Sequence, residues 1–214
     1  MRSRTIATAI IGLAALGGAS EAQASTLAVD APCYLENTSV SATGTGFTAG
    51  GPVNFSFDGQ LSASGTADTS GNFTQPLTAP LLPAGSLQHT FSLAAQDQTN
   101  PALAATAAVT VTKLAATLKP RRAKPTRKVR FGIHGMPPGR PVYLHYVFHG
   151  KQRARVKMGT AKAPCGTLTA RKRFFPMRRP AIGVWTFQLD PQKRYSKHTL
   201  PRIAARVTIF RTFR

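Results

Sequence analysis

The chain has 214 residues, of which 42% are hydrophobic and 8% aromatic, and its formal net charge is +21. The length allows one or two domains, and the hydrophobic content excludes a chain that is disordered throughout. The 16 Pro and 18 Gly indicate short strands joined by many turns.

The first 24 residues have the three parts of a secretory signal peptide. Arg2 and Arg4 give a positively charged start, which is followed by an apolar run over residues 6–16. Ala22-Gln23-Ala24 then forms a small-x-small cleavage site. The apolar run is short for a membrane span, and no later run is long enough for one. We therefore predict that residues 1–24 are removed and that the mature protein is secreted, to the extracellular side or the cell envelope.

The mature chain has two cysteines, Cys33 and Cys165. An even number of cysteines in an oxidising compartment favours a disulfide. Two separate buried thiols are the alternative, because the spacing of the cysteines along the chain does not show whether their Cα atoms approach each other.

An internal repeat divides the mature chain. Residues 40–58 read VSATGTGFTAGGPVNFSFD and residues 129–148 read VRFGIHGMPPGRPVYLHYVF. The positions matched at one constant offset are Gly46 with Gly135, Gly50 with Gly139, Pro52 with Pro141 and Val53 with Val142. Three further matches follow in the same order: 71–74 with 166–169, 90–93 with 186–189, and 108–111 with 206–209. This order predicts two domains, residues 25–112 and residues 113–214.

Alternation of apolar and polar residues predicts antiparallel strands in both halves. Val53, Phe55 and Phe57 alternate with polar residues, and the stretches 129–133 and 142–148 have the same period of two. Short strands at regular spacing, separated by Gly, Pro, Asn and Asp, are typical of a sandwich. The predicted fold is all-β, with two tandem immunoglobulin-like (Ig-like) antiparallel β-sandwich domains after the signal peptide.

The order CYLENTSVSATGTGFTAGGPVNFSFDG, then CGTL before a basic run, then GVWTFQLD, resembles uncharacterised secreted tandem Ig-like proteins of high-GC Gram-positive bacteria, of actinobacterial type. The resemblance covers essentially the whole mature chain, and it implies an extracytoplasmic Ig-like fold with no established activity. Antibody domains carry two cysteines on facing strands of one domain. Here neither Cys33 nor Cys165 has a counterpart in the other repeat, so a disulfide between them would join the two domains.

The positive charge is confined to the second half. No Lys or Arg falls between Ser25 and Thr112, whereas 26 of the 28 lie in residues 113–214, with Asp190 as the only acid there. Alternation places several of these cations on outward-facing strand positions, in rows that we expect to share one sheet face with Tyr143, His145 and His149. The predicted polyanion-binding residues are Lys128, Arg130, Arg153, Arg155, Lys157, Arg171 and Arg173.

Such a basic face suits a polyanion, because Arg makes paired hydrogen bonds to phosphate and the release of counterions adds affinity. The candidate partners are an anionic wall polymer, an anionic membrane surface, an acidic protein or nucleic acid. Specific nucleic-acid recognition is disfavoured, because no helix-turn-helix, RNA-recognition or zinc-finger pattern is present. Two alternatives need no ligand: the cations guard strand edges against aggregation, or the acidic first domain packs on the basic second one.

The sequence argues against an enzyme. No G-x-S-x-G, H-E-x-x-H or Gly-rich phosphate-binding motif occurs, and the acids are scattered singly among turns. His145 and His149 lie four residues apart on one predicted strand, about 13 Å, which is too far for one metal ion. We therefore predict no catalytic residue, no metal ligand and no cofactor, and a structural or interaction role, with polyanion binding as the alternative.

Overall fold

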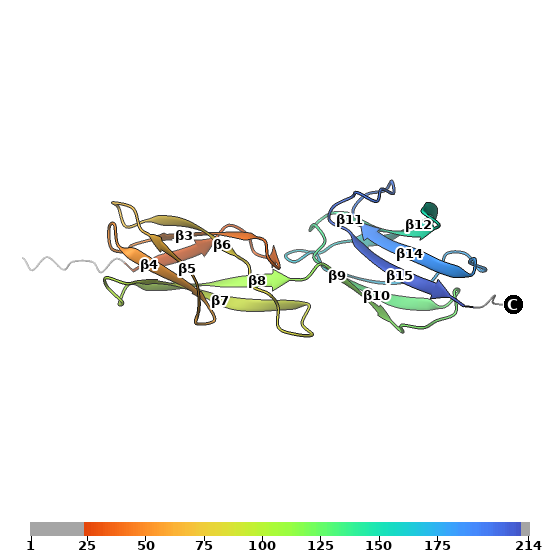
Figure 1. The fold of residues 1–214 in the computed structure, drawn as a ribbon, viewed down its shortest axis with the longest axis horizontal. Helices are drawn as coiled ribbons and strands as arrows, with labels where there is room; N and C mark the ends of the chain where they lie inside the picture. The colour runs from red at the N-terminus through yellow and green to blue at the C-terminus, as the bar shows by residue number, and fades with distance from the viewer. Residues whose placement is uncertain (1–23, 211–214) are drawn as a thin grey trace, which may run out of the picture.

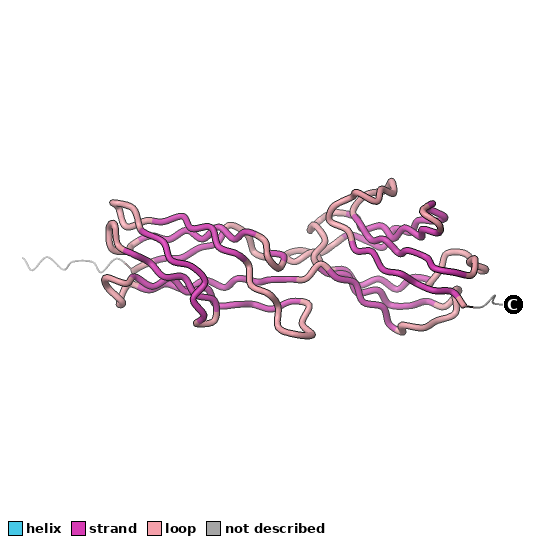
Figure 2. The backbone as a smooth tube through the Cα atoms, viewed as in Figure 1, coloured by secondary structure: helices cyan, strands magenta, loops and turns pink. Residues whose placement is uncertain are grey.

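A computed structural model of the protein describes residues 24–210. The predicted signal peptide, apart from Ala24, lies outside these described residues. Within them the chain forms 15 strands joined by loops and contains no helix (Figure 2). The described part of the chain accordingly has no apolar helix of membrane-spanning length.

The first sandwich has eight strands in two sheets. These are β1 (Thr26–Val29), β2 (Tyr34–Leu35), β3 (Ser39–Thr45), β4 (Pro52–Phe57), β5 (Gln60–Thr66), β6 (Phe73–Thr78), β7 (Gln88–Asp97) and β8 (Ala104–Thr112). One sheet has the order β1-β3-β6 and the other has the order β2-β8-β7-β4-β5. Neighbouring strands are antiparallel except β2, which runs parallel to β8.

The second sandwich repeats this plan with seven strands. These are β9 (Ala115–Lys119), β10 (Lys128–His134), β11 (Pro141–Phe148), β12 (Lys151–Thr160), β13 (Leu168–Arg173), β14 (Gly183–Asp190) and β15 (Ile203–Ile209). Its sheets have the orders β13-β10-β9 and β12-β11-β14-β15. Two antiparallel sheets with crossing connections make each unit an Ig-like sandwich, as the sequence predicted.

Each sandwich has its own hydrophobic core, formed by the inward positions of the alternating strands. In the first, Phe55 and Leu93 are fully buried against residues of the opposite sheet such as Val40. In the second, Ile133 faces a cluster that contains Trp185, which is 2% exposed. The period of two in the sequence predicted the core-facing residues of β4 and β10 correctly.

The internal repeat has a structural cause at its glycines. Gly46 and Gly135 both have positive φ angles (80° and 76°), and Gly139 in the second unit has the same left-handed backbone as its counterpart. This conformation is strained for residues with a side chain. The strands that follow begin at Pro52 and Pro141, which are matched positions. The repeat thus preserves the turn that connects β3 to β4, and β10 to β11, between the two sheets of each sandwich.

One of the sequence matches is wrong by two residues. The match of 90–93 with 186–189 pairs Leu93 with Leu189, but in the sheets Leu93 lies opposite Phe57 and Phe187 lies opposite Tyr146. Since Phe57 and Tyr146 occupy the same place in β4 and β11, Leu93 corresponds to Phe187. A shift of two residues keeps every side chain on its own face of the sheet, so alternation cannot detect it.

Cys33 and Cys165 form a disulfide that joins the two sandwiches, with their Cα atoms 5.3 Å apart. The alternative of two separate thiols is therefore excluded. Only Lys113 and Leu114 separate β8 from β9, and the units lie end to end (Figure 1). The disulfide gives the two sandwiches a second covalent connection close to this short linker.

Candidate functional site

The outer face of sheet β13-β10-β9 carries two rows of positive side chains. In register, Lys128 lies opposite Arg173 and Arg130 lies opposite Arg171. On its other side Arg130 lies opposite Lys119. All five side chains are exposed, because they alternate with core residues on their strands. We call these five residues the basic sheet face.

Within residues 24–210, no acidic side chain forms an ion pair with the basic sheet face. Among the described residues, the ion pairs are His89 with Asp58, Lys113 with Glu36 and His145 with Asp190, so none involves this face. Like charges directly opposite each other on neighbouring strands are destabilising. The face is therefore an exposed cluster of uncompensated charge that favours association with an anion.

Because these like charges lie directly opposite one another on neighbouring strands, replacing one of them should stabilise the fold. We expect Arg130→Thr to raise the free energy of unfolding by about 0.5 kcal/mol, since Thr suits a strand and two like-charge contacts disappear. Urea unfolding at low salt, followed by the fluorescence of the single Trp185, measures this. The control is Arg153→Thr, because Arg153 lies at an irregularity of the β11–β12 ladder and has no residue directly opposite. Equal stability of the two variants would contradict the expectation.

Three of the predicted residues do not belong to this face. Arg153, Arg155 and Lys157 lie on β12, which is an edge strand of the other sheet and pairs with β11. The prediction of one shared face is wrong, because after β12 the chain crosses to the opposite sheet before forming β13. The sequence shows that each strand has a polar side, but it does not show which strands pair.

Arg155 holds a loop. Its Nη1 donates a hydrogen bond to the carbonyl of Lys193 (2.8 Å) in the β14–β15 loop, and its guanidinium lies 5.8 Å from the ring centre of Tyr143. The Nε2 of Gln188 donates to the Ser196 carbonyl of the same loop (2.8 Å). Residues 191–199 are thus fixed over the outer surface of their own sheet.

This loop covers His145, which was predicted to be exposed beside Tyr143 and His149. His145 does point outward from its sheet, but it is fully buried. Its Nε2 lies 3.1 Å from the Gln192 carbonyl and 3.4 Å from Oδ1 of Asp190. His149 is exposed in the turn after β11. A loop folded over a sheet face overrides the alternation of the strand beneath it.

The surroundings of the buried pair favour the charged form of each partner. Burial lowers the pKa of His145, but Asp190, Gln152 and the Gln192 carbonyl outweigh burial and raise it above its ordinary value. Burial raises the pKa of Asp190, but hydrogen bonds from His145, from Gln188 and from the Gln192 amide outweigh burial and lower it. Both ring nitrogens of His145 face oxygen atoms, which suits the imidazolium form. The pair therefore acts as a structural anchor for the loop.

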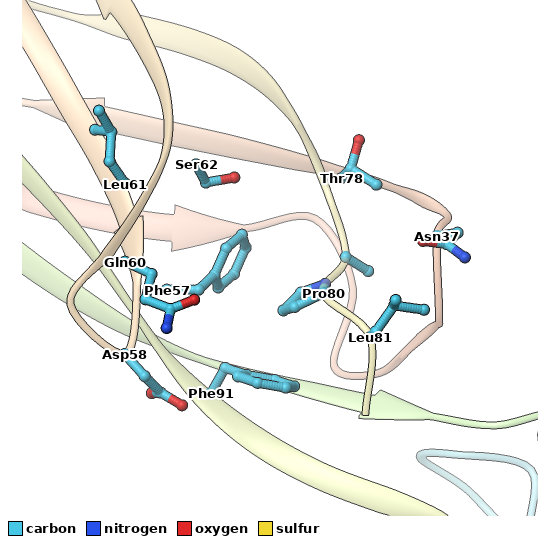
Figure 3. A pocket seen from close by; sticks show the side chains of 11 residues that line it. Asn37, Phe57, Asp58, Gln60, Leu61, Ser62, Thr78, Pro80, Leu81 and Phe91 are labelled. Atoms are coloured by element: carbon cyan, nitrogen blue, oxygen red, sulfur yellow. The ribbon is translucent and has the colours of Figure 1, made fainter. Parts of the chain in front are cut away.

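The described residues contain no group of three or more His, Cys, Asp and Glu that would hold a metal ion. The first sandwich has a hollow of about 500 Å³ between the β4–β5 turn and the segment after β6. Phe57, Phe91 and Pro80 form its apolar part, and Asp58 lies at its rim (Figure 3). This hollow is an open surface of mixed polar and apolar character, with one acidic group at its rim.

Two features of the second sandwich were missed by the sequence prediction. Lys119 completes the row with Arg130 and Arg171, and the signal for it was its place in the strand before Pro120. The second feature is a groove between β9 and β15, lined by apolar side chains and rimmed by cations. Its only signal was the divergence of the two repeats in this segment.

Comparisons with known proteins give distant similarities. No protein-family model matches the chain, and no curated protein matches it in sequence. The chain is similar to the solved ligand-binding domain of human OSCAR at 11% identity, with a TM-score of 0.34, over 86% of this chain and 97% of that one.

It is also similar to a tetra-tandem repeat in the extending region of a large adhesion protein, at 14% identity and a TM-score of 0.28, over 89% of this chain and 49% of that one. A third similarity is to Rst D1-D2, at 10% identity and a TM-score of 0.28, over 86% of this chain and 98% of that one. All three TM-scores lie below 0.5, so the assignment of two Ig-like sandwiches stands on their sheet topology alone.

Proposed function

We propose that the protein is a secreted, non-catalytic interaction module that binds an anionic polymer of the cell envelope through the basic sheet face of its second sandwich. The observation that carries this proposal is the row Arg171–Arg130–Lys119, in which three positive side chains lie directly side by side across three strands. The cations of this flat row are spaced by the distance between neighbouring strands, about 4.8 Å, so an extended polyanion lying along the row contacts all of them.

Secretion is part of this proposal. The disulfide between Cys33 and Cys165 supports it, since disulfides persist in oxidising compartments outside the cytoplasm. The absence of a catalytic role is supported by the burial of Asp190 and His145, the one close acid–base pair of the second sandwich, beneath a loop that keeps substrates away.

A polyanion affinity measurement tests the proposal. We expect the intact mature protein to stay on immobilised heparin at physiological salt and to elute at higher salt. The logarithm of the binding constant should fall linearly with the logarithm of the salt concentration, with a slope that reflects about four or five neutralised charges. Isolated wall polymer from a Gram-positive envelope should compete with heparin for the same face.

The control is a neutral polysaccharide of the same length, which should not retain the protein. Elution of the protein from heparin at or below physiological salt would refute polyanion binding. A slope of one or less would also refute it, because a row of side chains must release several counterions together.

A further inference from the structure

The first sandwich closes one of its edges with the short strand β2. Tyr34 of this strand lies opposite Val111 of β8, and its side chain is 7% exposed within the core. Its hydroxyl donates to Oδ1 of Asp30 (2.7 Å) and accepts a bond from the Ala31 amide (2.7 Å). The Glu36 amide then donates to the Thr112 carbonyl (3.2 Å). Strand β2 thus covers the free edge of β8 and fills the space beneath it.

The second sandwich has no such strand. The registers of β1–β3 and β9–β10 are the same, so the two segments align residue by residue. Asp30, Ala31, Tyr34 and Glu36 correspond to Lys119, Pro120, Ala123 and Pro125. Both amide donors become prolines, which have no N–H, and the aromatic plug becomes a methyl group. Among the described strands, β15 accordingly pairs only with β14.

A groove of about 1020 Å³ lies where β2 and Tyr34 would be. Its apolar lining includes Leu118, Ala123, Phe174 and Ile209. Phe210 at its margin is 82% exposed, whereas the corresponding residue of the first sandwich, Thr112 at the end of β8, is 2% exposed. The groove therefore has an open backbone edge on one side and an unfilled apolar floor.

The rim of the groove is positive. Lys119, Arg121, Arg122 and Arg206 line it, and all four are exposed. The only acid in residues 113–214 is Asp190, which is buried at the end of β14. Lys119 stands where the first sandwich has Asp30, so the carboxylate that accompanies the aromatic plug is missing here together with the plug. An occupant with its own carboxylates complements this rim.

We propose that this groove binds an extended acidic segment of a partner protein, which adds as a strand parallel to β15 and inserts an aromatic side chain above Ala123. The first sandwich supplies the template. Its aromatic residue Tyr34 lies on β2, which runs parallel to the last strand β8, and the carboxylate of Asp30 lies four residues before Tyr34. Backbone hydrogen bonds to β15 hold the segment, and the apolar floor and positive rim select its side chains. This surface shares Lys119 with the basic sheet face, but the other four residues of that face, Lys128, Arg130, Arg171 and Arg173, do not line the groove.

The chain itself provides a probe. A synthetic peptide of residues 28–38 with Cys33→Ser carries Asp30, Tyr34 and Glu36. We expect it to bind the intact mature protein in isothermal titration calorimetry and to shift the amide resonances of Ile209 and Phe210 in NMR spectra. A peptide with Tyr34→Ala should bind about tenfold more weakly or worse, because the aromatic side chain supplies most of the buried area.

Two protein variants locate the site. Ala123→Tyr should fill the groove from within and abolish peptide binding, and Trp185 fluorescence checks that the variant is folded. Arg121→Gln with Arg122→Gln weakens the rim without touching the core, so it keeps the test valid if the first variant does not fold. The double variant Arg130→Gln/Arg171→Gln should bind the peptide as the parent does, which separates this site from polyanion binding.

Tyr34-dependent binding that Ala123→Tyr or the Arg121/Arg122 variant removes supports the proposal. It is overturned if no binding is detected at millimolar peptide, or if the Tyr34→Ala peptide binds equally well, which would mark simple charge attraction. Self-association of the protein that Ala123→Tyr abolishes would also overturn it, because the occupant would then be a second copy of this chain.

Discussion

Replacing Gly166 with alanine is expected to unfold the second sandwich under conditions in which the parent is stable. The φ angle of Gly166 is +62°, and a Cβ atom at this position would overlap the carbonyl oxygen of Met136. Gly166 and Met136 are also joined by a backbone hydrogen bond (3.2 Å). Backbone strain and the clash together should cost about 4 kcal/mol or more. Urea unfolding followed by Trp185 fluorescence reports the second sandwich, because this is the only tryptophan in the chain.

Gly139→Ala is the matched control for this experiment. Gly139 has nearly the same left-handed backbone (φ +74°), but a Cβ there meets no atom within 4 Å. Its replacement should therefore cost only the conformational strain, about 1–2 kcal/mol. A Gly166→Ala variant as stable as Gly139→Ala would show that the loop before β13 is free to move away from Met136.

Asp190→Asn is expected to destabilise the second sandwich by about 3 kcal/mol near pH 5.5, because it leaves His145 charged and buried without its partner. The two side chains are fully buried with His145 Nε2 3.4 Å from Asp190 Oδ1. The new amide group would also face the Nε2 amide of Gln188, which now donates to Oδ2 of Asp190 at 2.7 Å. The β14–β15 loop should also become more mobile in this variant, since Gln188 and His145 both hold that loop.

The pH dependence follows from the two pKa shifts. The raised pKa of His145 gives a stabilisation that is fully present below its unfolded value of 6.5 and is lost as the pH rises through the folded value. The lowered pKa of Asp190 gives one that is present above its unfolded value of 3.8 and is lost as the pH falls through the folded value. The free energy of unfolding of the parent should thus be highest between these limits. In Asp190→Asn, the decrease in this free energy at higher pH should be smaller than in the parent.

Asp58→Asn controls for the loss of a carboxylate beside a histidine. Asp58 and His89 are 3.8 Å apart, but their side chains are 47% and 42% exposed. Such a pair contributes less than about 0.5 kcal/mol in water. Urea unfolding between pH 4 and pH 8 compares the variants, and equal losses in Asp58→Asn and Asp190→Asn would contradict the role given to the buried pair.

The fold was predictable from local patterns because its constraints are local. Gly46 and Gly135 are each fixed by one turn conformation, and the strand after each turn shows its buried side by alternation alone. The pairing of β12 with β11 rather than with β13 depends on residues far apart in the chain. The sequence therefore predicted which cations are exposed but divided them wrongly between the sheets.

The burial of His145 and the groove above Ala123 could not be predicted from the sequence for a similar reason. The alternation along a strand shows which side chains share a face of the sheet. It does not show whether a loop covers that face or whether a neighbouring strand covers the edge. The groove follows from the shared register of the two repeats, which places Ala123 where the first sandwich has Tyr34. The strand pattern of the second repeat by itself contains no sign of this missing side chain.

We propose that the basic sheet face, and not the total charge, binds the polyanion. Two double variants with equal loss of charge distinguish these possibilities: Arg130→Gln/Arg171→Gln on the face, and Arg153→Gln/Lys157→Gln on β12. At physiological salt, Arg130→Gln/Arg171→Gln should weaken the affinity for heparin about tenfold or more and lower the salt slope by about two. Arg153→Gln/Lys157→Gln should change the affinity and the salt slope little. Equal losses in the two variants would contradict the claim.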